Sequence, residues 1–324
     1  MSERQRDEYL AAWRATCDDS GKSASVRLQT SPSMAEAAGI GDRGVQFHHQ
    51  GDVSAAKSCY EAALAIDPDR VPTLNNLGLL FAQSGDLKGA DECLHRALEI
   101  DPLHVSSLAN LGLVRAARGD CAGARDLFER AVHVDPAHHV AWDNLGRLAM
   151  TQGDESTAER AWREAAMLAP TNETAWRGLA MIAVQSNRLS SVFEVLQSAL
   201  EHLTDSAGIW SDLGMVFLLR HDFGIAVETL RRASELSPGD SAIRRQYAMA
   251  LAALGEMSQA IDQLEQILRC DPKDMEARVD RAVLLLRLGQ FAAAREELNA
   301  VLRLAPDHPR ALQHRDLLIA TNAP

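Results

Sequence analysis

The residues whose types suggest chemistry in this sequence are three glycines and a short lysine-containing segment. Gly39, Gly41 and Gly44 match the G-x-G-x-x-G pattern of dinucleotide-binding loops. That pattern requires a preceding β-strand, so that backbone N–H groups face a pyrophosphate, but here the surrounding residues predict a helix. Gly21-Lys22-Ser23 matches the end of a phosphate-binding loop, yet Thr16 stands where that loop needs its upstream glycine. Neither pattern predicts a nucleotide site.

Histidines and cysteines do not have the spacing of a metal or redox site. His133, His138 and His139 form a cluster, but no H-x-x-x-H or H-E-x-x-H spacing puts two ligands on one helical face. The five cysteines include no C-x-x-C pair, and their odd number is typical of a reducing, cytoplasmic setting. No Ser-His-Asp or paired-carboxylate arrangement stands out. The sequence therefore predicts no catalytic residue, no cofactor and no metal site.

Composition and charge favour a helical protein that binds neither nucleic acid nor membrane. The 324 residues include 33 Lys and Arg against 45 Asp and Glu, so the net charge of −12 repels phosphate backbones. Hydrophobic residues make up 46% of the chain and aromatic residues 5%, with alanine and leucine recurring throughout, which suits packed helices. The apolar run at 282–286 is bounded by Arg281 and Arg287 and is too short to span a bilayer.

The elements that position these residues recur with a period of 34. Taking the recurring proline as residue 32 of each repeat, prolines stand at 68, 102, 136, 170, 238, 272 and 306, and Thr204 takes the one missing place. Position 8 is always glycine or alanine, and position 24 is a large residue such as Tyr60, Phe128 or Trp162. A small residue opposite a large one lets two helices approach closely.

Turn residues divide each repeat into two helices. Glycine followed by aspartate falls in mid-repeat, as at Gly85-Asp86, and glycine is the usual residue of a left-handed helix end. The Asp-Pro pairs, as at 101–102, end the second helix because proline cannot continue it. Each repeat is therefore predicted to be helix, turn, helix, with no strands.

A 34-residue helical hairpin with this pattern resembles the tetratricopeptide repeat. The resemblance covers 37–308 as eight repeats and implies an all-α, right-handed superhelical solenoid. We expect 309–324 to form a capping helix. We expect 1–36 to form a short helix, with an apolar stripe of Tyr9, Leu10 and Trp13, followed by a flexible linker.

Two repeats depart from the pattern. The first has Arg43 at position 7 and glycines at 39, 41 and 44, which predict a frayed helix. The fifth has Asn187-Arg188 in place of Gly-Asp and Thr204 in place of proline, which predicts a change of curvature or a looser repeat.

In tetratricopeptide arrays the first helix of each repeat lines a concave face, so the resemblance implies that positions 6 and 9 face a ligand. An asparagine amide can pair with both the N–H and the C=O of a peptide backbone. The row at position 6 resembles the asparagine ladder in the repeat domain of O-linked N-acetylglucosamine transferases. The candidate peptide-binding residues are Asn76, Asn110, Asn144, Leu79, Leu113, Arg147, Arg177, Met181, Met215 and Met249.

Structural roles for the same residues remain open. The asparagines could be exposed polar residues of the repeat consensus, and the methionines could pack between first helices. Lysine at position 5 and asparagine at position 9, which form the carboxylate clamp of chaperone-binding tetratricopeptide domains, are both absent.

We therefore expect a non-catalytic adaptor or assembly factor that binds a protein or peptide partner in its concave groove. One alternative is a non-catalytic subunit of a protein-modifying enzyme complex, such as a glycosyltransferase. The other is a scaffold whose partner binds its convex face or its N-terminal helix. A free-standing enzyme is the class least compatible with the sequence, because only 52 residues lie outside the repeats.

Overall fold

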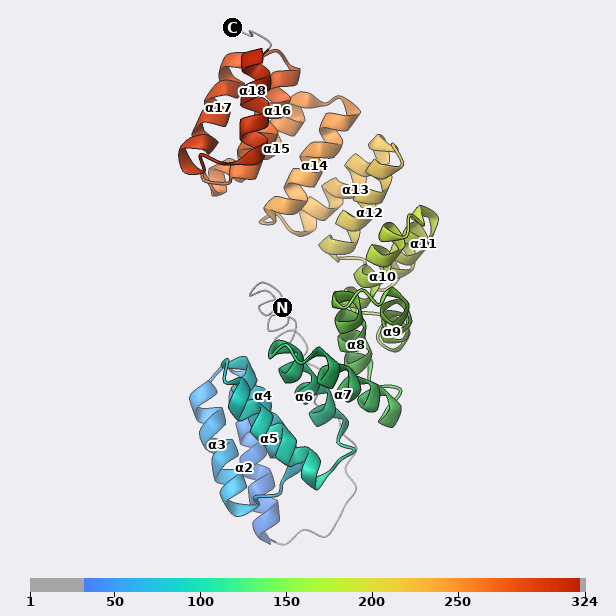
Figure 1. Cartoon of the computed structure of the whole chain (residues 1–324), viewed down its shortest axis with the longest axis vertical. Coiled ribbons are helices and arrows are strands. Elements are labelled where there is room, and N and C mark those ends of the chain that lie inside the picture. The colour runs from blue at the N-terminus through green and yellow to red at the C-terminus, as the bar shows by residue number, and fades with distance from the viewer. Residues whose placement is uncertain (1–31, 321–324) are drawn as a thin grey trace. The chain divides into compact units, whose positions relative to one another are not determined.

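The structure is a computed structural model that describes residues 32–320, and these residues form helices joined by short turns (Figure 1). They divide into two compact units between Ile182 and Ala183, inside α10, and each unit is described by itself. The first helices of the repeats are α2 (Pro32–His49), α4 (Val71–Gln83), α6 (Val105–Ala117), α8 (His139–Thr151), α10 (Glu173–Gln185), α12 (Ala207–Leu219), α14 (Ser241–Leu254), α16 (Met275–Arg287) and α18 (Pro309–Ala320). The second helices are α3 (Val53–Ile66), α5 (Leu87–Ile100), α7 (Cys121–Val134), α9 (Glu155–Leu168), α11 (Leu189–Leu200), α13 (Phe223–Leu236), α15 (Met257–Cys270) and α17 (Phe291–Leu304).

These bounds confirm the 34-residue period. From α4 to α18, every first helix begins 34 residues after the previous one, and the second helices from α3 to α17 do the same. The fifth repeat, which departs most from the sequence pattern, contains the division between the two units. The all-helical, tetratricopeptide-like fold is therefore as the sequence predicts.

The N-terminal end of the array differs from the expectation. Helix α2 begins at Pro32, so the boundary expected at residue 37 falls inside a helix. Its 18 residues are continuous across Gly39, Gly41 and Gly44, so the prediction of a frayed first helix is wrong. The G-x-G-x-x-G pattern thus lies within α2, and the described residues directly before it, 32–38, are helical. The short helix expected around Tyr9 and Trp13 lies outside the described residues.

The turn inside each hairpin explains the Gly-Asp pairs. Gly85 has a φ of +86°, which an L-residue with a side chain rarely adopts, and the neighbouring Asp86 accepts a hydrogen bond from the Gly89 N–H at 2.9 Å. Aspartates 52, 120 and 154 cap their helices in the same way. In later repeats Asn187 and His221 occupy the left-handed position, with φ of +53° and +63°.

Within a hairpin, the small residue at position 8 receives the large one at position 24. A Cβ atom placed on Gly112 would lie 2.6 Å from Cε1 of Phe128, which is completely buried. Gly44 and Gly146 stand in the same relation to Tyr60 and Trp162. Close helix approach, the role expected of these small residues, is therefore what the packing shows.

From α8 to α16, the side chain at position 4 of each first helix bonds to the turn before that helix. The indole Nε1 atoms of Trp142, Trp176 and Trp210 donate to the carbonyl oxygen six residues earlier, at 2.7–2.9 Å. Arg244 and Arg278 do the same with a guanidinium nitrogen. Tryptophan and arginine are interchangeable here because both are long side chains that end in N–H donors.

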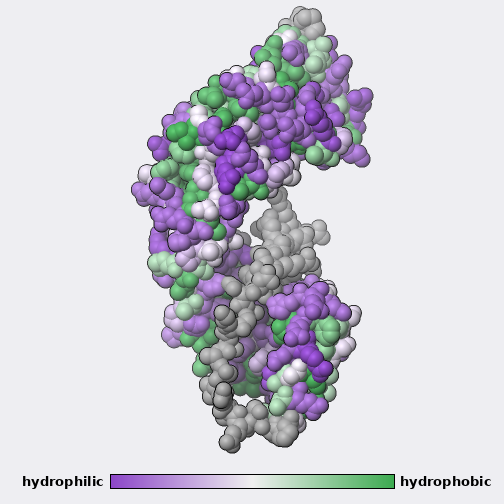
Figure 2. Space-filling view, turned by 180° about the vertical axis from the view of Figure 1, so that it is seen from behind, coloured by the Kyte–Doolittle hydropathy of each residue, from purple (hydrophilic) through white to green (hydrophobic). Residues whose placement is uncertain are grey.

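Each unit has its own core, built from the buried stripes of neighbouring helices. In the first unit the core includes Leu108, Phe128 and Leu145 of successive helices. In the second unit, Leu230, Leu251 and Leu264 belong to one cluster. A further cluster includes Leu298 of α17 and Leu318 of α18, the last helix. Figure 2 shows hydrophilic and hydrophobic residues interspersed on the visible face. None of the helices between residues 32 and 320 is long and apolar enough to cross a membrane.

Candidate functional site: the first-helix face

The candidate binding residues lie on what we call the first-helix face, which consists of positions 2, 5, 6, 9, 12 and 13 of the first helices. In the first unit, Asn76, Asn110 and Asn144 occupy position 6 of α4, α6 and α8. Helix α6 contacts both α4 and α8, so the three asparagines stand on successive neighbouring helices. Such helices pack about 8–10 Å apart, which is roughly three residues of an extended chain.

The three asparagines have different hydrogen-bond partners. Asn110 donates from Nδ2 to Oδ1 of Asn75 at 2.9 Å, and Asn75 donates from its own Nδ2 to Oδ1 of Asn76 at 3.3 Å. Asn144 is completely buried, and neither atom of its amide has a partner in the described part of the chain. The three asparagines are equivalent in the sequence pattern, but in the structure they differ in their hydrogen-bond partners.

Whether a position-6 side chain has a partner on the preceding first helix depends on the residue at position 5 of the preceding repeat, which is 35 residues earlier in the sequence. Asn75 pairs with Asn110 in this way, the Ser211 hydroxyl donates to Gln246, and Arg245 donates from Nε to Asp280 at 2.8 Å. We name this contact the 5–6 ladder. Asn144 lacks it because Ala109 stands at position 5 of the repeat before.

The 5–6 ladder is a feature that the position-by-position sequence analysis missed. Its signal is present in the sequence, because complementary polar residues occur 35 apart where the contact forms. It is interrupted a second time at Asp143, whose counterpart 35 residues later is Gly178, and Oδ1 of Asp143 has no hydrogen-bond partner among the described residues. Burial raises the pKa of the Asp143 carboxyl above its ordinary value, while the nearby Arg147 opposes the rise.

The apolar candidates divide into buried and exposed residues. Leu79 and Leu113 belong to the core of the first unit and are 8% and 3% exposed. Met181 is exposed. In the second unit Met215 is half-buried and Met249 is 51% exposed, on α12 and α14, which contact each other. The methionines thus offer apolar surface, whereas the two leucines pack inside.

The two arginines that interrupt the row both have partners within the chain. The Arg177 guanidinium lies 3.6 Å from the Glu173 carboxylate, one turn earlier on α10. The positive charge of Arg147 lowers the pKa of the nearby Asp143 carboxyl and so opposes the effect of burial. Arg147 is half-buried and Arg177 is exposed.

One histidine of the cluster at 133–139 has a structural role. His138 is the N-cap of α8, with Nδ1 accepting from the Ala141 N–H at 3.1 Å, and His104 caps α6 in the same way. Burial lowers the pKa of both histidines below the ordinary value, which favours the neutral form that can accept this bond. Within residues 32–320 no group of three or more His, Cys, Asp or Glu side chains is placed to hold a metal ion.

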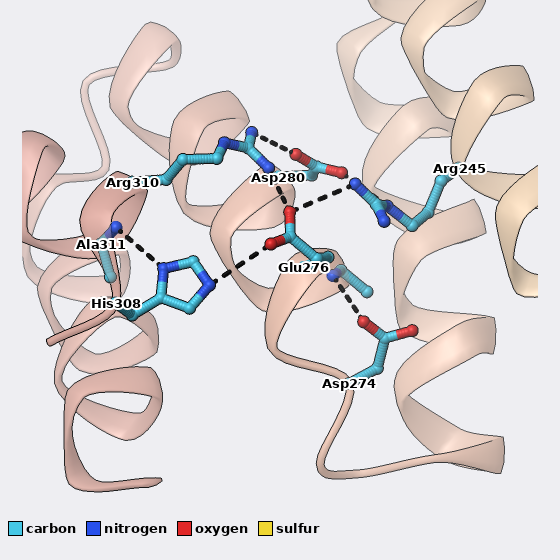
Figure 3. Close-up of polar contacts among 8 residues, drawn as sticks. Arg245, Asp274, Glu276, Asp280, His308, Arg310 and Ala311 are labelled. Carbon is cyan, nitrogen blue, oxygen red and sulfur yellow. Dashed lines mark hydrogen bonds and ion pairs between the residues drawn. The ribbon is translucent and has the colours of Figure 1, made fainter. Parts of the chain in front are cut away.

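The second unit has a feature that the sequence analysis did not anticipate: a hollow of about 320 Å³ on its first-helix face. Its apolar wall includes Met249 and Val283, and Arg245, Asp280, Arg287 and Arg310 also line it. Figure 3 shows the charged group beside it, in which Glu276 lies between arginines from two other helices.

Comparison with known proteins identifies the family. The family model described as the cilia and flagella-associated protein 70 C-terminal domain, a tetratricopeptide-repeat model, matches residues 102–283, which is more than half of the chain. Two models described as tetratricopeptide repeat match residues 259–314, and 47–70 with 71–102. The chain therefore belongs to the tetratricopeptide-repeat family. Among curated proteins, no sequence matches it.

Solved structures support the fold. Yeast Tom70 is 16% identical, with a TM-score of 0.56, over 99% of this chain and 71% of that one. The Pseudomonas aeruginosa pilF structure is 16% identical, with a TM-score of 0.55, over 67% of this chain and 98% of that one. A tetratricopeptide repeat protein from Parabacteroides merdae is 14% identical, with a TM-score of 0.54, over 79% and 100%. At these identities the similarity establishes the fold alone.

Proposed function

We propose that this protein is a non-catalytic cytoplasmic adaptor or assembly factor that binds a partner polypeptide along its first-helix face. Families of this repeat type are typically non-catalytic, and the fold suggests protein partners. The partner's main chain runs across α4, α6 and α8 in an extended conformation. Asn76, Asn110 and Asn144 pair with its backbone N–H and C=O groups, and exposed methionines contact its apolar side chains.

The observation that carries this proposal is the hydrogen-bonding capacity left over in the position-6 row. Asn76 has a free Nδ2 and Asn110 a free Oδ1 within the described residues, and Asn144 has both groups free. Asn76 and Asn110 therefore each keep one amide group for a ligand, whereas Asn144 is completely buried and pairs with a ligand only when the side chains that cover it move. A buried amide without partners costs about 1–3 kcal/mol, so a polar ligand that pairs with Asn144 recovers part of that cost.

The cysteines support a reducing compartment. Cys59, Cys93, Cys121 and Cys270 are free thiols. Burial raises the pKa of Cys93 to about 11, so its thiol stays protonated and unreactive at neutral pH.

The proposal is tested by affinity capture from the native lysate with the full chain. The variant replaces Asn76, Asn110 and Asn144 with alanine. Each lost hydrogen bond is worth about 1 kcal/mol, so the three together weaken binding roughly a hundredfold. A matched control replaces three exposed amide residues of the second helices, namely Gln197, Gln259 and Asn299.

A partner that the control retains and the variant loses supports the proposal, provided that both have wild-type helicity. A partner that both variants retain contradicts it. In that case the second helices or the first 31 residues become the next surfaces to test.

A further inference from the structure

The hollow in the second unit combines an apolar wall with a charged rim. Ala248, Met249 and Ala252 of α14 and Val283 and Leu284 of α16 contribute apolar surface, and Leu264 of α15 lies behind them. Met249 and Val283 stand at first-helix-face position 9 and Ala252 at position 12, so the hollow opens on the face that the proposed function uses. A cavity of about 150 Å³ holds a benzene ring, so about 320 Å³ is enough for a large side chain.

Three arginines stand around this apolar wall, and two of them are already neutralised. Arg245 contacts Glu276 at 3.5 Å and Asp280 at 2.8 Å. Arg310, from the last helix α18, pairs with the same two carboxylates. His308 adds a contact from its Nε2 to Glu276 at 3.3 Å, as Figure 3 shows. The shared carboxylates hold α14, α16 and α18 together and fix the shape of the rim.

The third arginine has no such partner. Arg287 is exposed at position 13 of α16, and no carboxylate in the described part of the chain lies within ion-pair distance of it. The two carboxylates of the rim are balanced by Arg245 and Arg310, so Arg287 gives the hollow one uncompensated positive charge. A ligand of complementary charge is therefore an acidic one.

We propose that the hollow binds a large apolar side chain of the partner polypeptide that lies within about two residues of an aspartate or glutamate. The apolar side chain packs on Met249 and Val283, and the acidic one pairs with Arg287. This inference rests on the proposed function, because it names the sequence class that the second unit selects. The apolar contact supplies affinity, and the charge restricts which apolar segments bind.

The test uses a phage-displayed library of random dodecapeptides, selected on the full-length protein. Selected peptides are then titrated against three single variants. Arg287→Glu reverses the free charge, and Ala253→Phe places a ring at the mouth of the hollow from an exposed position of α14. Arg303→Glu makes the same charge change on an exposed residue of α17 that does not line the hollow.

The expected result is enrichment of peptides that carry Leu, Ile, Met or Phe within about two residues of an aspartate or glutamate. Arg287→Glu and Ala253→Phe should each weaken their binding at least about tenfold, while Arg303→Glu changes it less than about twofold. Selection on the Arg287→Glu variant should favour a basic residue in place of the acidic one.

Two results would overturn the inference, and they are distinguishable. Peptides that bind equally well to all three variants but are lost with the three asparagine substitutions would locate binding in the first unit alone; the proposed function would stand and the hollow would not be a site. Failure to enrich any peptide would count against both. Wild-type thermal unfolding of each variant ensures that loss of binding is not loss of folding.

Discussion

A single methyl group added at Gly112 tests the packing relation between positions 8 and 24. In the wild-type structure the new Cβ atom would lie 2.6, 2.9 and 3.0 Å from three atoms of the Phe128 ring. Carbon atoms prefer a separation of about 3.5–4.0 Å, so the ring has to move by about 1 Å. Phe128 is completely buried, and its neighbours therefore have to move as well.

The expected loss of stability follows from two opposing effects. Overpacking of this kind costs about 1–3 kcal/mol, while replacing a mid-helix glycine with alanine gains about 1 kcal/mol. Gly112→Ala should thus lower the free energy of unfolding by about 0–2 kcal/mol. Gly39, in α2, has no atom within 4 Å of its added Cβ, so Gly39→Ala should keep the full gain. The two variants should differ by about 1–3 kcal/mol.

The assay compares urea unfolding midpoints of the two variants and localises the effect by hydrogen exchange. Amides of α6 and α7 should lose protection in Gly112→Ala, because stability in a repeat array depends on nearest neighbours. Phe128→Leu should relieve the strain, since repeats with alanine at position 8 have leucine at position 24, as in Ala248 with Leu264. The reasoning is refuted if Gly112→Ala and Gly39→Ala behave alike, or if Phe128→Leu leaves the difference unchanged.

Three further predictions concern caps, turns and ion pairs. The pKa of His104 and His138 is lowered in the folded state, so the unfolded chain binds more protons and the free energy of unfolding should fall as pH drops below about 6.5. Asparagine at both positions keeps the caps without titrating, and a variant with an unchanged pH slope in urea midpoints would contradict this. His221→Gly should raise the free energy of unfolding by about 0.5–1 kcal/mol because φ is +63° there, and a lower thermal midpoint would show the reasoning to be wrong. Glu297, 13% exposed, contacts Arg278 at 2.9 Å and Arg281 at 2.7 Å, so Glu297→Gln should cost about 1–3 kcal/mol in urea unfolding. Equal loss in the exposed control Glu296→Gln would exclude a specific ion-pair effect.

The regular part of this fold was predictable because it repeats. Prolines, glycines and small residues at a fixed period of 34 predicted two helices and a turn in each repeat, because each of these residues acts within one hairpin. The sequence also contains a signal for the start of α2 at Pro32, because proline is a frequent first residue of a helix. The serines on either side of Pro32 instead led to the prediction of a linker there.

The candidate site was less predictable because its properties depend on contacts between repeats. Asn76, Asn110 and Asn144 look identical along the sequence, yet Asn75, Ala109 and other neighbours give each a different hydrogen-bond state. The hollow was not predicted either, because its charged rim depends on a contact between repeats: Arg310 of α18 pairs with the Glu276 and Asp280 carboxylates of α16. Position-by-position analysis cannot show such contacts, whereas residue pairs 35 apart would have suggested some of them.

The central claim is that a partner polypeptide lies on the first-helix face, and site-specific photo-crosslinking tests it most directly. A photoreactive amino acid is placed at Asn76 or Met249 of the full chain, and at the exposed second-helix residues Gln197 and Gln259 as controls. Crosslinked protein from the native lysate is identified by mass spectrometry and confirmed with the purified partner. The account predicts one partner crosslinked from Asn76 and Met249 and not from the controls. A partner crosslinked from Gln197 or Gln259, with none from the first-helix face, would contradict it.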